Sequence, residues 1–177
     1  MADDTRMMTM KRSKHQIMTK ESILNFSQTK AEPLWLQERR LTAFDNIDKL
    51  TLPEINRVKF HRWNLGDGTI SEDQALANVP DFTALGGNPK LVQVGTQTVL
   101  EQLPTDLINK GVIFTDFYTA LEEIPDIIEK YFGAARDFKE DKLAAYHTAY
   151  FNSAAVLYVP DNIEIEEPIE GLFYQDK

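Results

Sequence analysis

The sequence predicts an α+β protein: a helical amino-terminal region, a small αβ segment, and short strands of a stacked β structure at the end. Apolar residues recur at helical spacing between residues 33 and 50. Glycine and proline turn signals divide residues 91–133 into short strand-like and helix-like pieces. After residue 153, short apolar runs alternate with turns, which is typical of strands.

Composition limits the classes of function that are open to the chain. Its 177 residues are 42% hydrophobic and 27% charged, as in ordinary globular proteins. The net charge of −9 would repel phosphate backbones, so we expect no nucleic-acid partner. No apolar run approaches the ~18–20 residues that span a bilayer, so we expect no membrane partner. Cysteine is absent, which excludes disulfides and makes a cytoplasmic location the simplest expectation.

The first 20 residues differ from the rest of the chain. They contain all five methionines, and their five basic and two acidic side chains give a net charge of +3. Because they lack apolar periodicity, we expect residues 1–20 to form a disordered leader, with either Met1 or Met18 as the natural start. A basic arm for an acidic partner and an arginine-containing transit peptide are the alternatives.

Residues 21–90 are expected to form a helical amino-terminal region that ends in a linker. Pro33 suits a first helical turn and Leu52-Pro53 should stop the helix, which predicts a helix from about Pro33 to Leu50. Trp35 lies beside the apolar stripe and is expected to pack rather than to anchor a partner. The stripe consists of Leu36, Leu41, Ala43, Phe44, Ile47 and Leu50.

Residues 54–68 carry no steady period, and residues 70–90 have the polar composition of a linker. Asn64–Asp73 lacks the ligand spacing of a calcium loop, and no phosphate-binding frame surrounds Gly86-Gly87. His61 is expected to be an ordinary surface or hydrogen-bonded histidine.

Residues 91–153 are expected to form the αβ segment. Leu91–Val94 and Thr98–Leu103 predict a hairpin. A helical turn should follow and end at Gly111, because glycine tolerates the left-handed conformation that closes such turns. The remaining elements are a strand over Val112–Phe114, a helix capped by Thr115 or Asp116, a helix from Pro125 to Gly133, and a helix after Asp141 with Leu143, Tyr146 and Tyr150 on its apolar face.

Residues 154–177 are expected to start the stacked β structure. Ala154–Val159 is apolar on both faces of a strand, so both faces should be covered. Pro160–Asn162 predicts a turn, and Ile163–Glu166 alternates as a strand with one solvent face does. Another apolar run begins at Ile169.

Residues with catalytic potential do not show the spacings that catalysis or metal binding requires. Adjacent carboxylates on one element point apart, so the acidic pairs should be solvated. Ser153 has no nucleophile elbow around it. His147 could ligate iron, but we expect it at a core edge. We assign no catalytic, cofactor-binding or metal residue and expect no enzyme. The acidic pairs are Glu122-Glu123, Glu140-Asp141 and Glu166-Glu167, and the histidines are His15, His61 and His147.

Three blocks resemble a known family and occur in that family's order. They are EPLWLQERRLTAF (Glu32–Phe44), GVIFTDFYTALEEIPDIIEKYFG (Gly111–Gly133) and FNSAAVLYVPDNIEIEEPI (Phe151–Ile169). Together they are similar to the amino-terminal part of the SufB/SufD family, the scaffold proteins of the SUF iron–sulfur cluster assembly system. The absence of cysteine makes the SufD members the closer likeness.

The resemblance implies the amino-terminal fragment of a SufD-like, non-catalytic scaffold subunit that works with SufB-like and SufC-like (ATPase) partners. It implies that residues 154–177 begin a right-handed parallel β-helix. Thiolates hold most iron–sulfur clusters, so we expect no cluster cofactor in this part of the protein. We carry over no site residue, because the family's proposed cluster-site residues lie beyond Lys177.

Two other functions stay open on the sequence alone. One is a small acidic hydrolase that uses a carboxylate pair, and the other is an unrelated protein-interaction domain. An incomplete β stack would also leave apolar strands uncovered, so we expect self-association through residues 154–177.

Overall fold

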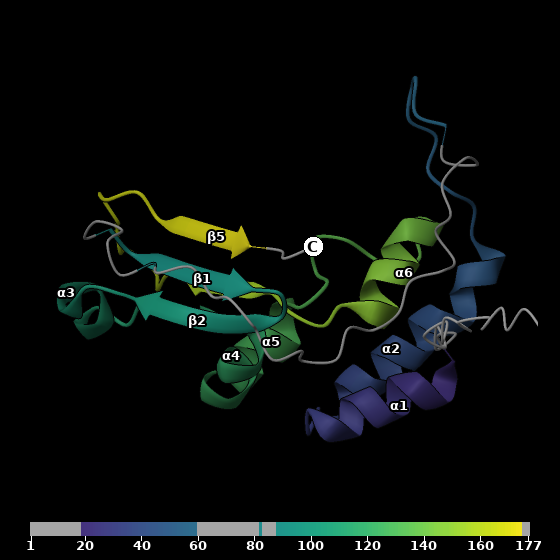
Figure 1. Ribbon diagram of the computed structural model, residues 1–177, viewed down its shortest axis with the longest axis horizontal. Coiled ribbons are helices and arrows are strands. Elements are labelled where there is room, and N and C mark those ends of the chain that lie inside the picture. The colour runs from purple at the N-terminus through teal and green to yellow at the C-terminus, as the bar shows by residue number, and fades with distance from the viewer. Residues whose placement is uncertain (1–18, 60–81, 83–87, 175–177) are drawn as a thin grey trace, which may run out of the picture.

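The structure is a computed structural model that describes residues 19–59, 82 and 88–174. It is an α+β protein with the amino-terminal helices at one end and a small strand region, accompanied by further short helices, at the other (Figure 1). Expectations for residues 1–18, His61, Asn64–Asp73 and Gly86-Gly87 lie outside the described residues.

Two helices open the fold. Helix α1 covers Lys20–Thr29, and its cap residue Thr19 accepts a hydrogen bond from the backbone N–H of Ser22 at 3.1 Å. Helix α2 covers Leu34–Asn46 and tightens into a 3₁₀ turn, η1, over Ile47–Lys49. The helix predicted from Pro33 to Leu50 is therefore confirmed.

The predicted hairpin is also confirmed. Strands β1 (Lys90–Val94) and β2 (Gln97–Gln102) pair antiparallel, with a register shift between Val92 and Gln93. Helix α3 (Thr105–Asn109) follows and ends near Gly111, whose φ of +81° is the left-handed conformation that the sequence predicted.

Local capping signals place the next elements. Strand β3 covers Ile113–Asp116, and the Asp116 carboxylate caps helix α4 (Phe117–Glu123) by accepting from two backbone N–H groups. Helix α5 covers Pro125–Tyr131, with proline at its first turn as expected. Asp141 caps helix α6 (Lys142–Tyr150) in the same way as Asp116 caps α4.

Helix α6 packs partly through the face that was predicted. Tyr146 and Tyr150 lie half-buried against the first apolar cluster, whereas the completely buried face beside them consists of small side chains. Small residues let the backbones of two packed helices approach closely, and α6 packs along α2. The buried residues of α6 are Ala144, Ala145, Thr148 and Ala149.

Two apolar clusters share helix α2 between them. The first joins α1, α2 and α6, and the second joins α2 to α4, α5 and Phe151. Trp35 belongs to the second cluster, with its ring 6.0 Å from that of Phe132, so its predicted packing role is confirmed. The buried members are Ile23, Ala43, Ile47, Phe138, Ala145 and Ala149 in the first, and Leu36, Phe117, Ala120, Ile128 and Phe151 in the second.

The strands form two small sheets. One has the order β2-β1-β5, in which β5 (Glu170–Tyr174) runs parallel to β1 with Lys90 opposite Glu170. The other is an antiparallel pair of β3 and β4 (Ala155–Tyr158). The end of the chain therefore returns to a strand formed 80 residues earlier.

Several expectations for residues 154–174 need correction. Residues 163–166 form no strand in the described structure: their alternating exposure persists, but no neighbouring strand pairs with them. Strand β4 is not covered on both faces, since Leu157 is 45% exposed. The two strands after residue 154 join different sheets, β4 an antiparallel one and β5 a mixed one, so a parallel β-helix is not confirmed among the described residues.

Candidate functional site

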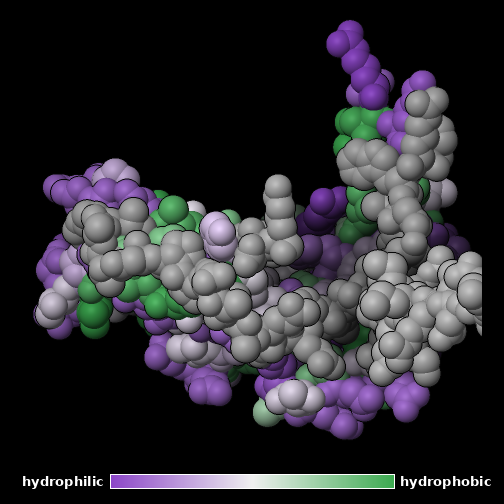
Figure 2. Space-filling view, in the orientation of Figure 1, coloured by the Kyte–Doolittle hydropathy of each residue, from purple (hydrophilic) through white to green (hydrophobic). Residues whose placement is uncertain are grey.

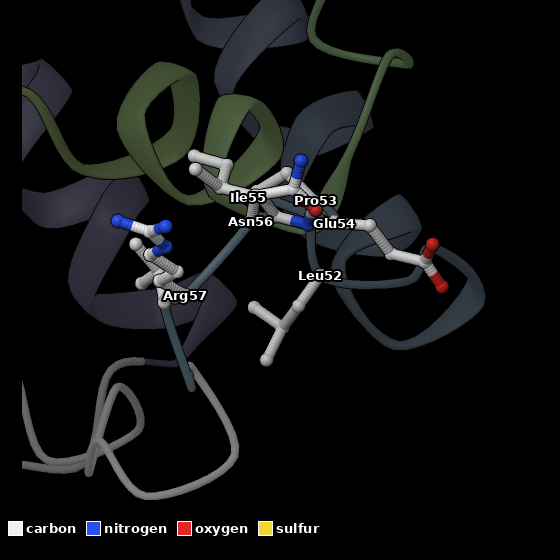
Figure 3. Close-up of a pocket in the computed structure, with 7 residues that line it drawn as sticks. Leu52, Pro53, Glu54, Ile55, Asn56 and Arg57 are labelled. Atoms are coloured by element: carbon white, nitrogen blue, oxygen red, sulfur yellow. The ribbon is translucent and has the colours of Figure 1, made fainter.

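A shallow hollow lies at the loop that follows η1 (Figure 3). Seven consecutive residues, 52–58, line it. Glu54 is the one carboxylate in this lining, and its side chain extends away from that of Arg57. A hydrolase of the acidic-pair type needs two converging carboxyl groups, and the hollow does not supply them.

The acidic pairs noted in the sequence do not converge either. Glu122 and Glu123 are exposed on α4, and Glu166 and Glu167 are exposed before β5. Asp141 is already used, because its carboxylate caps α6 and pairs with Arg136 at 2.6 Å.

Neither metal binding nor a membrane span finds support in the described part of the chain. His147 is exposed on α6, with its ring 6.4 Å from that of Phe151. Among residues 19–59, 82 and 88–174, no three His, Asp or Glu side chains gather as metal ligands would. No helix described there is long and apolar enough to cross a membrane.

The outer edge of β5 is the candidate interaction surface. Strand β1 pairs with one side of β5, and no described strand pairs with the other. Phe173 is 60% exposed and Tyr174 is 40% exposed on this strand. Figure 2 shows hydrophobic residues at the end of the molecule that carries this sheet. An open strand edge beside exposed aromatic side chains can take an added strand.

A polar cluster fixes the position of β5 in the sheet. Glu170 accepts a hydrogen bond from Asn88 at 3.0 Å and one from Lys90 at 3.1 Å. These two hydrogen bonds lower the pKa of the Glu170 carboxyl group below its ordinary value. Lys90 is almost wholly buried, so shifting β5 along β1 would separate a buried ammonium from its carboxylate.

A second polar cluster is completely buried between the helices. Arg40 of α2 and Glu32, which precedes α2, form an ion pair with neither side chain exposed. The guanidinium donates two hydrogen bonds to the Glu32 carboxylate, at 2.6 and 2.8 Å. Tyr118 of α4 donates to the same carboxylate at 3.0 Å. Burial, and then the nearby Glu32 charge, raise the pKa of the Tyr118 hydroxyl.

Sequence reasoning missed this cluster, although a signal was available. Arg40 lies four residues after Leu36 and three before Ala43, so it falls directly on the apolar stripe of α2. A charged residue at such a position must find buried partners. No local pattern shows that the partners come from Glu32 and Tyr118.

Comparison with known proteins identifies the family. Residues 88–170 match the family model described as the SufBD protein N-terminal region. The chain is 33% identical over 170 residues to the iron-sulfur cluster assembly protein SufD of Bacillus subtilis, covering 88% of this chain. The chain belongs to the SufB/SufD family. The resemblance noted in the sequence is thereby confirmed.

Other SufBD relatives are similar in sequence over most of the chain. A SufBD family protein of Mycobacterium tuberculosis is 25% identical over 170 residues, which is 85% of this chain and 20% of that protein. A SufBD family protein of Staphylococcus aureus is 25% identical over 174 residues, which is 88% of this chain and 37% of that protein. The chain spans 38% of the length of the Bacillus SufD, so it corresponds to a minor part of that relative. The matched region runs from Asn88 to Glu170, and the Asn88 amide donates a hydrogen bond to the Glu170 carboxylate at the start of β5.

Proposed function

We propose that this chain is the amino-terminal part of a SufD-like, non-catalytic scaffold subunit in SUF iron–sulfur cluster assembly, acting in the cytoplasm. The observation that carries the proposal is the 33% identity to a SufD over 170 residues. A scaffold role is supported by the open edge of β5, with which no described strand pairs and to which a partner could add a strand.

The cluster itself would be cargo of the assembly machinery rather than a cofactor of this chain. Cysteine thiolates hold most protein-bound iron–sulfur clusters, and the sequence contains no cysteine. We infer that any cluster chemistry takes place on partner subunits or on parts of the subunit outside these 177 residues.

We further propose SufB-like and SufC-like partners, and a parallel β-helix that continues from residues 154–177. The parallel pairing of β5 with β1 supports this idea, because it shows that the end of the chain can add strands in a parallel sense. In this proposal the leader is shortened from the predicted residues 1–20 to residues 1–18, because Thr19 caps α1 and Lys20 begins it. Residues 21–90 belong to a helical region with linker, and 91–153 are the αβ segment that covers the first coil.

Co-purification and a genetic measurement together test the function. A tagged form of the gene product should co-purify with SufB-like and SufC-like proteins of its own organism. Deleting the gene should lower the activity of iron–sulfur enzymes, while enzymes without clusters serve as the control. Unchanged iron–sulfur enzyme activity together with no co-purified partner would overturn the proposal.

A further inference from the structure

The buried Glu32–Arg40 pair joins more elements than any single apolar contact could. The Glu32 carboxylate also accepts a hydrogen bond from Ser27 of α1 at 2.8 Å, besides those from Arg40 and Tyr118. One carboxylate therefore receives donors from α1, α2 and α4.

Arg40 extends the same network to the end of α6. Its Nη1 donates to the carbonyl oxygens of Ala149 at 3.2 Å and Phe151 at 2.8 Å. Its guanidinium carbon lies 3.9 Å from the centroid of the Phe151 ring. The carbonyl groups at the carboxyl end of a helix lack partners within the helix, so Arg40 satisfies groups that would otherwise be buried unpaired.

We propose that the Glu32–Arg40 pair is a latch that selects one arrangement of the helical layer (α1, α2 and α6) against α4 and β4. Its contribution is to the uniqueness of that arrangement and not to the net free energy of folding. This role is independent of the proposed place in cluster assembly.

The hydrogen bonds of the latch are directional, whereas the apolar packing around it is not. Apolar burial is non-directional, and the face that α6 buries consists mainly of alanines, which would pack acceptably after a small slide or rotation. The planar guanidinium has donors in a fixed fork. A displaced α6 would withdraw two carbonyl groups from Arg40, and a displaced α4 would withdraw Tyr118 from Glu32.

The energetic consequence is asymmetric. Desolvating two charges offsets most of their mutual attraction, so replacing a whole buried pair by apolar residues is often close to neutral. Removing only one partner leaves a buried charge without compensation, which is strongly destabilising. The latch therefore penalises wrong arrangements more than it stabilises the right one.

A double replacement separates uniqueness from stability. In the full chain, Glu32→Leu with Arg40→Met should lower the melting temperature clearly less than Arg40→Met alone, and the remaining loss should come from the carbonyl groups of Ala149 and Phe151 that Arg40 no longer satisfies. Native-state amide exchange over residues 149–158 should nevertheless accelerate by on the order of tenfold, because α6 and β4 then sample several arrangements. Arg40→Met alone should lower the melting temperature far more than the double change.

The exposed Lys20–Asp45 pair supplies a matched control. Its atoms approach to 2.6 Å, but its side chains are 54% and 46% exposed. Lys20→Met with Asp45→Leu should leave exchange over residues 149–158 unchanged. The proposal is overturned if the Glu32→Leu, Arg40→Met protein keeps the original exchange pattern. It is equally overturned if that protein unfolds or melts as low as Arg40→Met, since the pair would then supply net stability.

Discussion

The guanidinium of Arg39 occupies the space that a β-carbon on Gly133 would need. Gly133 follows α5 with a φ of +74°, and its carbonyl accepts a hydrogen bond from Arg39 at 3.5 Å. The same guanidinium lies 5.6 Å from the ring centroid of Phe132 and 5.5 Å from that of Phe138. The missing side chain of Gly133 thus allows α2 to dock against the end of α5.

Gly133→Ala should destabilise the protein by more than the backbone conformation alone explains. A left-handed φ costs a non-glycine residue roughly 1–2 kcal/mol, and the new β-carbon must also displace Arg39. Gly111→Ala is the control, because φ is +81° there and the β-carbon would meet only Pro160, at 3.3 Å. Denaturant unfolding should show the larger loss for Gly133→Ala, and Arg39→Ala should recover part of it. Equal losses at the two glycines would mean that Arg39 moves aside without cost.

Tyr118→Phe should lower the free energy of unfolding by about 1.5 kcal/mol at neutral pH, the lower end for a hydrogen bond to a charged group. The loss is limited because Glu32 keeps its hydrogen bonds from Ser27 and Arg40. Tyr131, 59% exposed, provides the control, and its change to Phe should stay within about 0.5 kcal/mol. Chemical denaturation of the three proteins side by side decides the matter; indistinguishable midpoints would contradict the role given to the hydroxyl.

Alkaline pH should weaken the original protein more than Tyr118→Phe. The folded-state pKa of Tyr118 is raised above its ordinary value of 10.0, so the folded state keeps a proton that the unfolded state releases. Its contribution is therefore complete below pH 10 and is lost as pH rises above that value. Some alkaline loss should remain in Tyr118→Phe, because burial raises the pKa of Tyr150 to about 12. Unfolding curves at several alkaline pH values should show a steeper loss of stability in the original protein than in Tyr118→Phe. An equal loss in the two proteins would contradict the role given to the Tyr118 hydroxyl.

Glu170→Gln should flatten the loss of stability on acidification. The folded-state pKa of Glu170 is lowered, mainly by the hydrogen bond from Asn88 and then by that from Lys90. A lowered pKa contributes stability above the ordinary value of 4.5, and this contribution disappears as pH falls through the folded-state pKa. Melting temperatures between neutral pH and pH 3 provide the measurement. Asn88→Ala should produce part of the same change, and an unaltered acid dependence in Glu170→Gln would refute the proposed linkage.

Truncation should show that the dispensable leader ends before Thr19. The sequence predicted that residues 1–20 could be removed, but Thr19 caps α1 and Lys20 pairs with Asp45. Removing residues 2–18 should leave the melting temperature unchanged. Removing residues 2–20 should cost about 1 kcal/mol, the usual value of a lost helix cap. Thermal scans of both truncations test this, and a large loss from the shorter one would mean that the leader packs.

Self-association of the chain should depend on the exposed side of β5. Residues 154–177 were expected to associate because apolar strands remain uncovered, and Phe173 is the most exposed large apolar residue on β5. Phe173→Lys should reduce association in sedimentation at several concentrations, as should the Ile165→Lys, Leu172→Lys double change. Leu34→Lys, at a 68% exposed position on α2 outside residues 154–177, is the matched control. If the original chain sediments as a monomer at every concentration, the prediction of self-association is wrong.

The sequence predicted best those elements whose signals are local. Asp116 and Asp141 cap helices with their own side chains, and Gly111 and Gly133 adopt the left-handed conformation for which glycine is suited. Each of these features depends on a few neighbouring residues. A reader of the sequence can therefore place helix and turn boundaries without knowing the tertiary structure.

Features that depend on distant partners were beyond such reasoning. Residues 163–166 alternate as a strand does, yet a strand also requires a neighbouring strand that pairs with it, and no described strand pairs with these residues. Strand β5 finds its neighbour in β1 instead. The Glu32–Arg40 cluster likewise depends on donors and acceptors up to 111 residues away in the sequence.

The parallel pairing of β5 with β1 also sets an order of events during synthesis. Lys90 and Glu170 are separated by 80 residues, whereas the β1–β2 hairpin needs only its own short turn. At translation rates of about 5–20 residues per second, Glu170 is added roughly 4–16 s after Lys90. Hairpins form within about 1–10 μs, so the nascent hairpin presents an open flank for seconds before its third strand exists. During that interval the unpaired edge of β1 is the part of the nascent chain to which a chaperone specific for strand edges would bind.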